Sequence, residues 1–165
     1  MREHVFAPLG MASAGFGAPG STDAVDQPRG HRRSAVQPGP KADNPPAIGP
    51  AGTVHGSLRD WAKFISAHLA GERGGGAFLA PETFRKLHEP APISTYAMGW
   101  NRVAREWAGG DVLMHAGSNT MLYCVVLIAP ANDHAFLAAT NIGGDKAAKA
   151  CDAAIAAMLK TRKLL

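Results

Sequence analysis

Three apolar runs in the second half of the chain alternate with short polar breaks. Residues 112–114, 121–129 and 135–140 are rich in Val, Ile, Leu and Ala, and Gly, Pro, Asn and Asp separate them. Runs bounded in this way are typical of buried strands rather than helices. Residues 130–133 favour a hairpin, because Asn and Asp tolerate the left-handed backbone. The pattern predicts an antiparallel sheet, with a polar turn at Gly117 after the first run.

One more strand is expected before these runs. Residues 96–103 predict a strand that contains Gly99 and Trp100. Residues 106–107 and 112–114 continue the sheet in antiparallel sense around a glycine-rich turn.

The clearest helix covers residues 57–69. Ser57 is a favoured N-cap, and Asp60 three residues later gives a variant of the capping box. Gly71 is expected to end the helix. The apolar positions at helical spacing are Leu58, Trp61, Ala62, Phe64, Ile65 and Leu69.

Two further helices are expected. One begins at Pro81, a favoured first-turn residue, and runs to about His88. The other covers about residues 145–160 and begins at Asp145, where the helix dipole favours an acidic group. The predicted fold class is therefore α+β, an antiparallel sheet with the C-terminal helix packed on it.

Residues 17–52 differ in character from the rest of the chain. Thirteen of these 36 residues are Gly or Pro, and no apolar period persists. This composition predicts a long Pro/Gly-rich loop inside a single domain that covers residues 1–165.

Charge and composition exclude several classes of function. The net charge is +4, and the only dense basic cluster, Arg29, Arg32 and Arg33, lies in the Pro/Gly-rich loop. A solvated loop is the better interpretation than a nucleic-acid surface, so no nucleic-acid partner is expected. The seven histidines are scattered and show no metal-ligand spacing, so neither a metal nor a cofactor is expected.

Cysteine usage and hydropathy add little. Cys124 and Cys151 are expected to be free thiols, although a bridge between them is left open. No segment has the length of a membrane span, and residues 1–6 lack the features of a secretory signal. The chain as given is expected to be cytoplasmic.

The candidate chemistry lies in His115, Ala116, Gly117 and Ser118. His115 can hold a proton near neutral pH, and Gly117 lets the backbone approach a ligand closely. The backbone N–H of Ser118 is then a candidate oxyanion donor. The alternative is a histidine that merely ends a strand beside a tight turn.

The chain resembles the C-terminal part of the serine β-lactamase-related family, which includes class C β-lactamases, D-alanyl-D-alanine carboxypeptidases and related esterases. The likeness begins with VFAPLGM at residues 5–11 and continues with PAGTV at 50–54 and DWAKF at 60–64. It then passes through LAPETF at 79–84 and YAMGW at 96–100. HAG at 115–117 stands at the family's Lys-Thr-Gly position, where many members carry His-x-Gly.

This resemblance implies a β-lactamase/transpeptidase-like, penicillin-binding-protein-like fold with an incomplete N-terminal portion. It also implies a serine hydrolase that opens a β-lactam, a D-Ala-D-Ala peptide or an ester through an acyl-enzyme. His115, Ala116, Gly117 and Ser118 would then bind the substrate, with His115 and the Ser118 N–H in catalytic roles.

The family's nucleophile motif Ser-x-x-Lys and its Tyr-x-Asn motif do not occur in this sequence. The chain is therefore expected to be a C-terminal fragment that is inactive alone, and whether it is an enzyme is left open. A non-catalytic binding module and one half of a split enzyme are the alternatives. The expected partners are a small-molecule or peptide substrate, the missing N-terminal half, or a second copy. For a full-length family member, a periplasmic or extracellular location is equally open.

Overall fold

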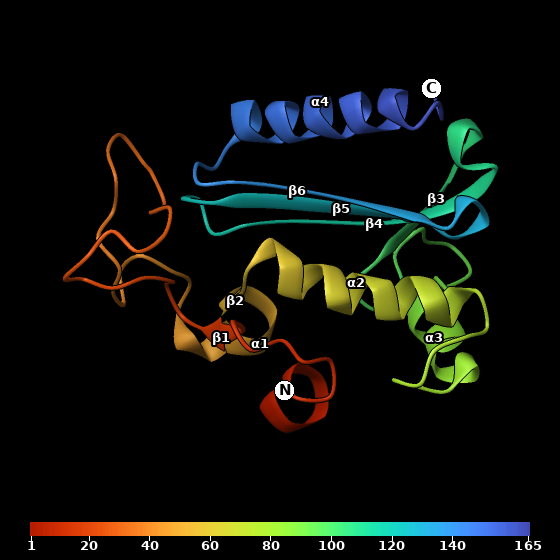
Figure 1. Ribbon diagram of the computed structural model, residues 1–165, viewed down its shortest axis with the longest axis horizontal. Helices are drawn as coiled ribbons and strands as arrows, with labels where there is room; N and C mark the ends of the chain where they lie inside the picture. Colours follow the sequence, from red (N-terminus) through yellow and green to blue (C-terminus); the bar gives the residue numbers. More distant parts are fainter.

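A computed structural model describes residues 1–165 and shows a four-stranded antiparallel sheet with helices on both faces (Figure 1). The strands, in their order across the sheet, are β3 (Asn101–Arg105), β4 (Gly110–Ser118), β5 (Tyr123–Ala129) and β6 (His134–Thr140). Helix α4 (Asp145–Thr161) covers one face, while α2 (Leu58–Glu72) and α3 (Pro81–His88) lie on the other side (Figure 1). The expected α+β class is confirmed, as is the packing of the C-terminal helix on the sheet.

In Figure 1 the N-terminal third of the chain lies below the sheet and beside the left-hand ends of the strands. Its regular elements are the π-helix η1 (Arg2–Phe6), β1 (Gly15–Phe16), the 3-10 helix η2 (Pro46–Ile48), α1 (Gly49–Gly52) and β2 (Val54–His55). Strands β1 and β2 form a separate antiparallel pair. The end of the Pro/Gly-rich stretch is therefore helical, since η2 and α1 fall within it.

The hairpins of the main sheet differ in detail from the expected pattern. The strand predicted at 96–103 begins only at Asn101, because Gly99 adopts φ +89° and the Ala97 N–H donates to the Trp100 carbonyl at 2.7 Å. Residues 106–107 are not extended either; they lie in the 3-10 helix η3 (Glu106–Ala108). The last strand of the predicted sheet follows η4 (Pro130–Asn132), and Asp133 at φ +56° adopts the left-handed backbone expected there.

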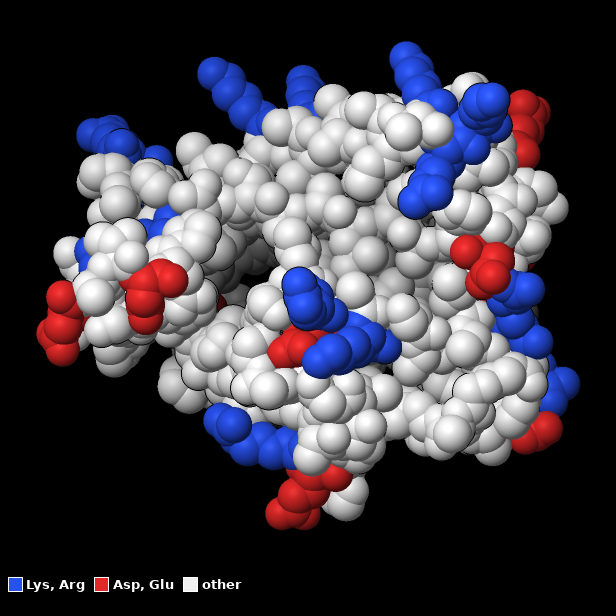
Figure 2. Space-filling view, viewed as in Figure 1, with Lys and Arg blue, Asp and Glu red and all other residues white.

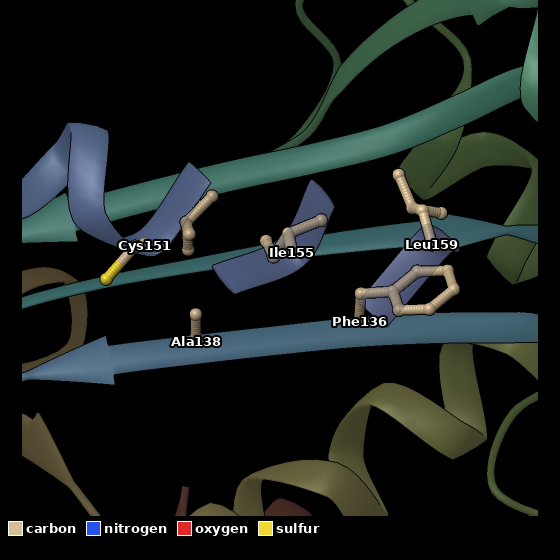
Figure 3. Packing of buried hydrophobic residues seen from close by; sticks show 6 residues of the cluster. Phe136, Ala138, Cys151, Ile155 and Leu159 are labelled. Atoms are coloured by element: carbon tan, nitrogen blue, oxygen red, sulfur yellow. The ribbon is translucent and has the colours of Figure 1, made fainter. Parts of the chain in front are cut away.

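Two apolar clusters hold the layers together, one on each face of the sheet. The cluster under α4 joins the sheet to the helix (Figure 3), and its members are Val125, Phe136, Ala138, Cys151, Ile155 and Leu159. The cluster on the α2 face consists of Ile65, Trp100, Leu113, Val126 and Ile128. Neighbouring residues of β5 thus serve opposite cores, which explains why the whole run is apolar. Cys124 and Cys151 are both free thiols.

Helix α2 begins as the sequence predicts. The Ser57 hydroxyl accepts a hydrogen bond from the Asp60 N–H at 3.2 Å, so Ser57 is the N-cap. The apolar face is less regular than expected, because Leu58 is 53% exposed whereas His68 is buried on that face.

Replacing Ser57 by alanine is expected to lower the free energy of unfolding by about 1 kcal/mol, because one N–H of the first turn loses its acceptor. Urea unfolding monitored by circular dichroism measures the change. Ser66, exposed on the same helix, provides the matched control. Ser66→Ala should be neutral or stabilising by a few tenths of a kcal/mol, and an equal loss in both variants would contradict the capping role.

Helix α2 ends later than predicted, because Gly71 lies within it rather than after it. Gly71 is buried, and a Cβ atom there would lie 2.1 Å from Cδ2 of Phe84 in α3. The glycine therefore marks the point of closest approach between the two helices.

Candidate functional site

The predicted site residues lie on a strand whose outer edge is open. Strand β3 pairs with β4 only as far as Asn101 opposite Met114, whereas β5 pairs with β4 up to Ser118 opposite Tyr123. Residues 115–118 therefore have a partner strand on one side only. None of the backbone hydrogen bonds outside the helices and strands involves them. Because peptide groups alternate in direction along an antiparallel strand, alternate residues of this stretch turn their N–H and C=O toward the open side.

The predicted bend at Gly117 is wrong. Gly117 lies within β4, opposite Cys124, and its φ is not positive. The chain reverses only at residues 119–122, where Thr120 adopts φ +72°. The pairing with β5 keeps the whole of residues 115–118 extended.

Alternation along β4 places the candidate side chains on opposite faces of the sheet. His115 lies opposite Val126, which belongs to the core on the α2 face, so His115 and Gly117 face that side. Ser118 lies opposite Tyr123, which packs against the core under α4. The structure thus brings the four residues together along one edge but does not direct their side chains into one cavity.

His115 is exposed and rests against a buried aromatic group. The centroids of its ring and of the Trp100 ring are 6.5 Å apart, in an edge-to-face arrangement at 74°. Trp100 is only 5% exposed. This contact restricts the positions of the imidazole on its core side and leaves the other side free for a ligand.

The Ser118 hydroxyl is already used by the turn that follows it. It donates to the Leu122 carbonyl at 2.7 Å and accepts from the Thr120 N–H at 3.0 Å. The Asn119 side chain completes the turn by accepting from the N–H groups of Met121 and Leu122. The Ser118 hydroxyl is therefore not available for chemistry, and only the backbone of Ser118 is. This agrees with the expectation that the Ser118 N–H, and not its hydroxyl, is the oxyanion donor.

A hollow of about 420 Å³ lies beside this end of β4, on the α4 side of the sheet. Of the predicted residues, only Ser118 lines it. Burial raises the pKa of Tyr123 in its wall. The lining residues are Ser118, Thr120, Tyr123, Gly143, Gly144, Asp145 and Ala148.

The Pro/Gly-rich loop is anchored to the same end of the sheet. The His31 N–H donates to the Met121 carbonyl at 3.0 Å, and the Asn119 amide donates to Asp43 Oδ1 at 3.0 Å. Figure 2 shows the surface hollowed between this loop, at the left, and the rest of the molecule. The loop therefore forms part of the surroundings of residues 115–118.

A chain of buried polar side chains behind Trp100 was not anticipated from the sequence. His68 Nδ1 lies 2.7 Å from His88 Nε2, and His88 Nδ1 lies 2.6 Å from Glu72 Oε1. Burial lowers the pKa of His68 to about 4, with the nearby His88 charge as the second cause. The hydrogen bond from His88 lowers the pKa of Glu72. The one signal for this group was the position of His68 and Glu72 on the buried side of the helix, three and seven residues after Ile65.

No serine in the structure has the surroundings of an activated nucleophile. The Ser13 hydroxyl donates to Asp60 Oδ2 at 2.6 Å, and Lys63 binds the other oxygen of the same carboxylate at 2.6 Å. This cluster ties residues 10–13 to the start of α2. No serine hydroxyl is hydrogen-bonded to a lysine or a histidine.

No group of three or more His, Cys, Asp or Glu side chains is arranged to hold a metal ion. None of the helices is both long enough and apolar enough to cross a bilayer.

Comparisons with known proteins identify one family and two solved structures of similar fold. The model of the family described as Beta-lactamase matches residues 1–160. None of the curated proteins matches the chain. Among solved structures, an octameric penicillin-binding protein homologue from Pyrococcus abyssi is similar, with a TM-score of 0.64, 18% identity and coverage of 96% of this chain and 36% of that one. The crystal structure of SurE is also similar, with a TM-score of 0.65, 17% identity and coverage of 97% and 39%. The chain thus spans between 36% and 39% of the length of these two structures.

Proposed function

The chain belongs to the β-lactamase family, and from this premise we propose that the open edge of β4 forms one wall of a serine hydrolase's acyl-transfer cleft. The observation that carries the proposal is the early end of β3. Because β3 stops opposite Met114, residues 115–118 keep unpaired backbone groups toward the open side. Such an edge can hydrogen-bond an extended acyl group much as a neighbouring strand would.

Each residue of the edge has a distinct role in this proposal. The His115 imidazole, backed by Trp100, orients the carboxylate or carbonyl of the substrate. Gly117 has no side chain to cover the backbone, and the space that a Cβ would occupy is open, with Cys124 Sγ as its nearest neighbour at 3.9 Å. The backbone at Gly117 is therefore accessible. The Ser118 N–H donates to the oxyanion that forms when the carbonyl is attacked. Ala116, which alternates with Ser118, is the second residue with its peptide group toward the same side.

The nucleophile is the part that this chain does not supply. Neither Ser-x-x-Lys nor Tyr-x-Asn occurs in its sequence, and no serine hydroxyl contacts a lysine. A site without its nucleophile retains only the weak catalysis of binding and oxyanion stabilisation. We therefore propose that the chain forms no acyl-enzyme by itself and that a separate segment brings the serine to the β4 edge.

Labelling tests the missing nucleophile. The purified chain is expected to give no covalent adduct with a fluorophosphonate or a fluorescent penicillin, as read by intact-mass spectrometry. A full-length serine β-lactamase treated in parallel provides the positive control. Stoichiometric labelling of any serine in this chain would overturn the statement that it lacks a nucleophile.

Binding to the edge is tested separately by titrating isotope-labelled chain with benzylpenicillin or D-Ala-D-Ala. Amide shifts should concentrate at residues 115–118, and His115→Ala should weaken the binding about tenfold, the loss of about 1.4 kcal/mol. His4→Ala, an exposed histidine near the N-terminus, should leave the binding unchanged. Shifts spread evenly over the surface, or none at millimolar ligand, would contradict the cleft proposal.

The absence of both motifs also favours a second candidate, a non-catalytic binding module. The encoding DNA upstream of Met1 distinguishes a fragment, a split enzyme and a binding module from one another. An in-frame Ser-x-x-Lys supports a fragment, a neighbouring frame that carries the motif supports a split enzyme, and no such motif supports a binding module.

We also propose that copies of this chain associate with one another. The penicillin-binding protein homologue from Pyrococcus abyssi is octameric. This chain also ends its sheet in an unpaired strand, which is a template for pairing with another chain.

A further inference from the structure

Glu72, His88 and His68 form a hydrogen-bonded series between α2 and α3, called the buried polar chain below. His88 is fully buried and is held at both ring nitrogens, with Nε2 2.7 Å from His68 Nδ1 and Nδ1 2.6 Å from Glu72 Oε1. Buried polar networks in which each member has its partner make the surrounding core rigid. The His88 ring therefore has one fixed orientation.

The contact between α2 and α3 does not itself require the buried polar chain. The two helices lie side by side (Figure 1) and meet at Gly71, where α3 supplies the fully buried ring of Phe84. Burying polar and ionisable groups costs free energy that apolar side chains of similar volume do not, so these groups are a poor means of joining two helices. The other contacts of the buried polar chain indicate a different role.

Both histidines of the chain contact Trp100. The ring centroids of His68 and Trp100 are 5.1 Å apart, and those of His88 and Trp100 are 5.8 Å apart, the second pair at an angle of 88°. A backbone hydrogen bond from the Met98 N–H to the Leu87 carbonyl, at 3.2 Å, also ties the turn before Trp100 to the end of α3. Trp100 is thus held from α2 and from α3.

Trp100 in turn contacts the candidate site. Its ring meets the exposed His115 imidazole edge to face, at a centroid distance of 6.5 Å. Contacts between aromatic rings are directional, so a change in the position of one ring alters the preferred position of the other. The orientation of His115 therefore depends on Trp100, and that of Trp100 depends on the two histidines behind it.

We propose that the buried polar chain positions His115 through Trp100, so that its three members are positioning residues of the candidate site. Glu72 anchors the His88 ring, the two histidines hold the indole, and the indole holds the imidazole that orients the carboxylate or carbonyl of the substrate. This role rests on the proposed part of His115 in substrate binding and adds the residues that keep the imidazole in place.

Glu72 is the member whose replacement tests this role most directly, because it is joined to Trp100 through His88. Its carboxylate also lies 3.8 Å from the Arg102 guanidinium, which binds Asp111 at 2.9 Å. Glu72→Ala removes the hydrogen-bond partner of His88, whereas Glu72→Gln keeps an oxygen for His88 but removes the charge that faces Arg102. The two variants therefore separate the hydrogen-bonded chain from the ion pair.

Nuclear magnetic resonance of the full chain observes both rings. In Glu72→Ala, the indole N–H signal of Trp100 and the ring C–H signals of His115 should shift, while Glu72→Gln should retain the parent positions. The Trp107 indole, packed under α4 on the other face of the sheet, is the internal reference and should not move. Ile155→Val weakens the core under α4 by one methyl group and controls for a general loss of stability. It should leave the signals of both rings in place.

Titration with benzylpenicillin connects the ring positions to binding. Glu72→Ala should raise the dissociation constant about threefold, the size of effect that a network of packed side chains transmits. Glu72→Gln should leave it unchanged, and in a His115→Ala background the two variants should bind alike. Glu72→Asp, a milder change that draws the carboxylate away from His88, should shift the same signals by less and carries the test if Glu72→Ala does not fold.

The outcomes distinguish the two proposals. Unchanged Trp100 and His115 signals in Glu72→Ala, or an equal shift in Glu72→Gln or Ile155→Val, would overturn the positioning role and leave the cleft proposal standing. Shifted signals with an unchanged dissociation constant would do the same. A parent chain that binds no benzylpenicillin at millimolar concentration would overturn the cleft proposal, together with the positioning role that rests on it, even if the signals shift as expected.

Discussion

Gly71→Ala is expected to lower the free energy of unfolding by about 3 kcal/mol, because the added methyl group has no space between α2 and α3. Its carbon would lie 2.1 Å from the ring of Phe84, a side chain with no exposed surface. Alanine would otherwise stabilise a helix by about 1 kcal/mol relative to glycine. The clash outweighs that gain, since relieving it requires α3 to move away and expose Phe84 to water.

Urea unfolding monitored by tryptophan fluorescence measures this loss. Gly75→Ala is the matched control, because a Cβ at Gly75 meets only the Ala70 carbonyl at 3.6 Å, an ordinary contact. Phe84→Leu should partly rescue Gly71→Ala, so that the double variant is more stable than the sum of the single changes predicts. If Gly71→Ala is as stable as the parent protein, α3 does not approach α2 as closely as the structure shows.

The strands could be predicted because their burial is local and continuous. Residues of β5 alternate between Val125 under α4 and Val126 above α2, so every position is apolar and the run is visible in the sequence. Turn chemistry at Asp133 was equally visible. Both features depend only on residues that are neighbours in the sequence, so the sequence alone is enough to predict them.

The site could be predicted only in part, because its decisive feature is non-local. The sequence directs attention to His115 and Ser118, but it also predicts a bend at Gly117, which is wrong. Glycine permits a bend without requiring one, and pairing with β5 keeps it extended. The open edge exists because a turn at Gly99 delays the start of β3, and that consequence appears only when strands are placed side by side.

The buried histidine pair could not be predicted from the sequence for the same reason. His68 and His88 are twenty residues apart in the chain and meet only because α3 packs against α2. Each histidine alone is an unremarkable polar residue in an amphipathic helix. Their contact with each other, with Glu72 and with Trp100 is a property of the packed structure.

Acidification from pH 6.5 to 4 is expected to remove about 3 kcal/mol from the free energy of unfolding through His68 alone. Burial lowers its pKa in the folded state to about 4, against 6.5 for a free histidine. The unfolded chain therefore binds a proton on this residue that the folded chain excludes. The contribution to stability is complete above pH 6.5 and is lost as the pH falls toward 4. Glu72, whose pKa is also lowered, adds a loss of the same sign at still lower pH.

Histidine NMR and urea unfolding at pH 7, 5.5 and 4.5 test this prediction together. His88 Nδ1 is hydrogen-bonded to Glu72, and the hydrogen bond between His68 Nδ1 and His88 Nε2 needs a proton on one of these two nitrogens. His68→Asn keeps a donor near that position but removes the titrating group. The variant should lose stability at pH 7 yet show a flatter dependence between pH 6.5 and 4. The control His4→Ala should retain the full slope, because His4 is exposed. A His68 ring that titrates near pH 6.5 in the folded protein, or an unchanged slope in His68→Asn, would show that His68 is not held neutral by burial behind Trp100.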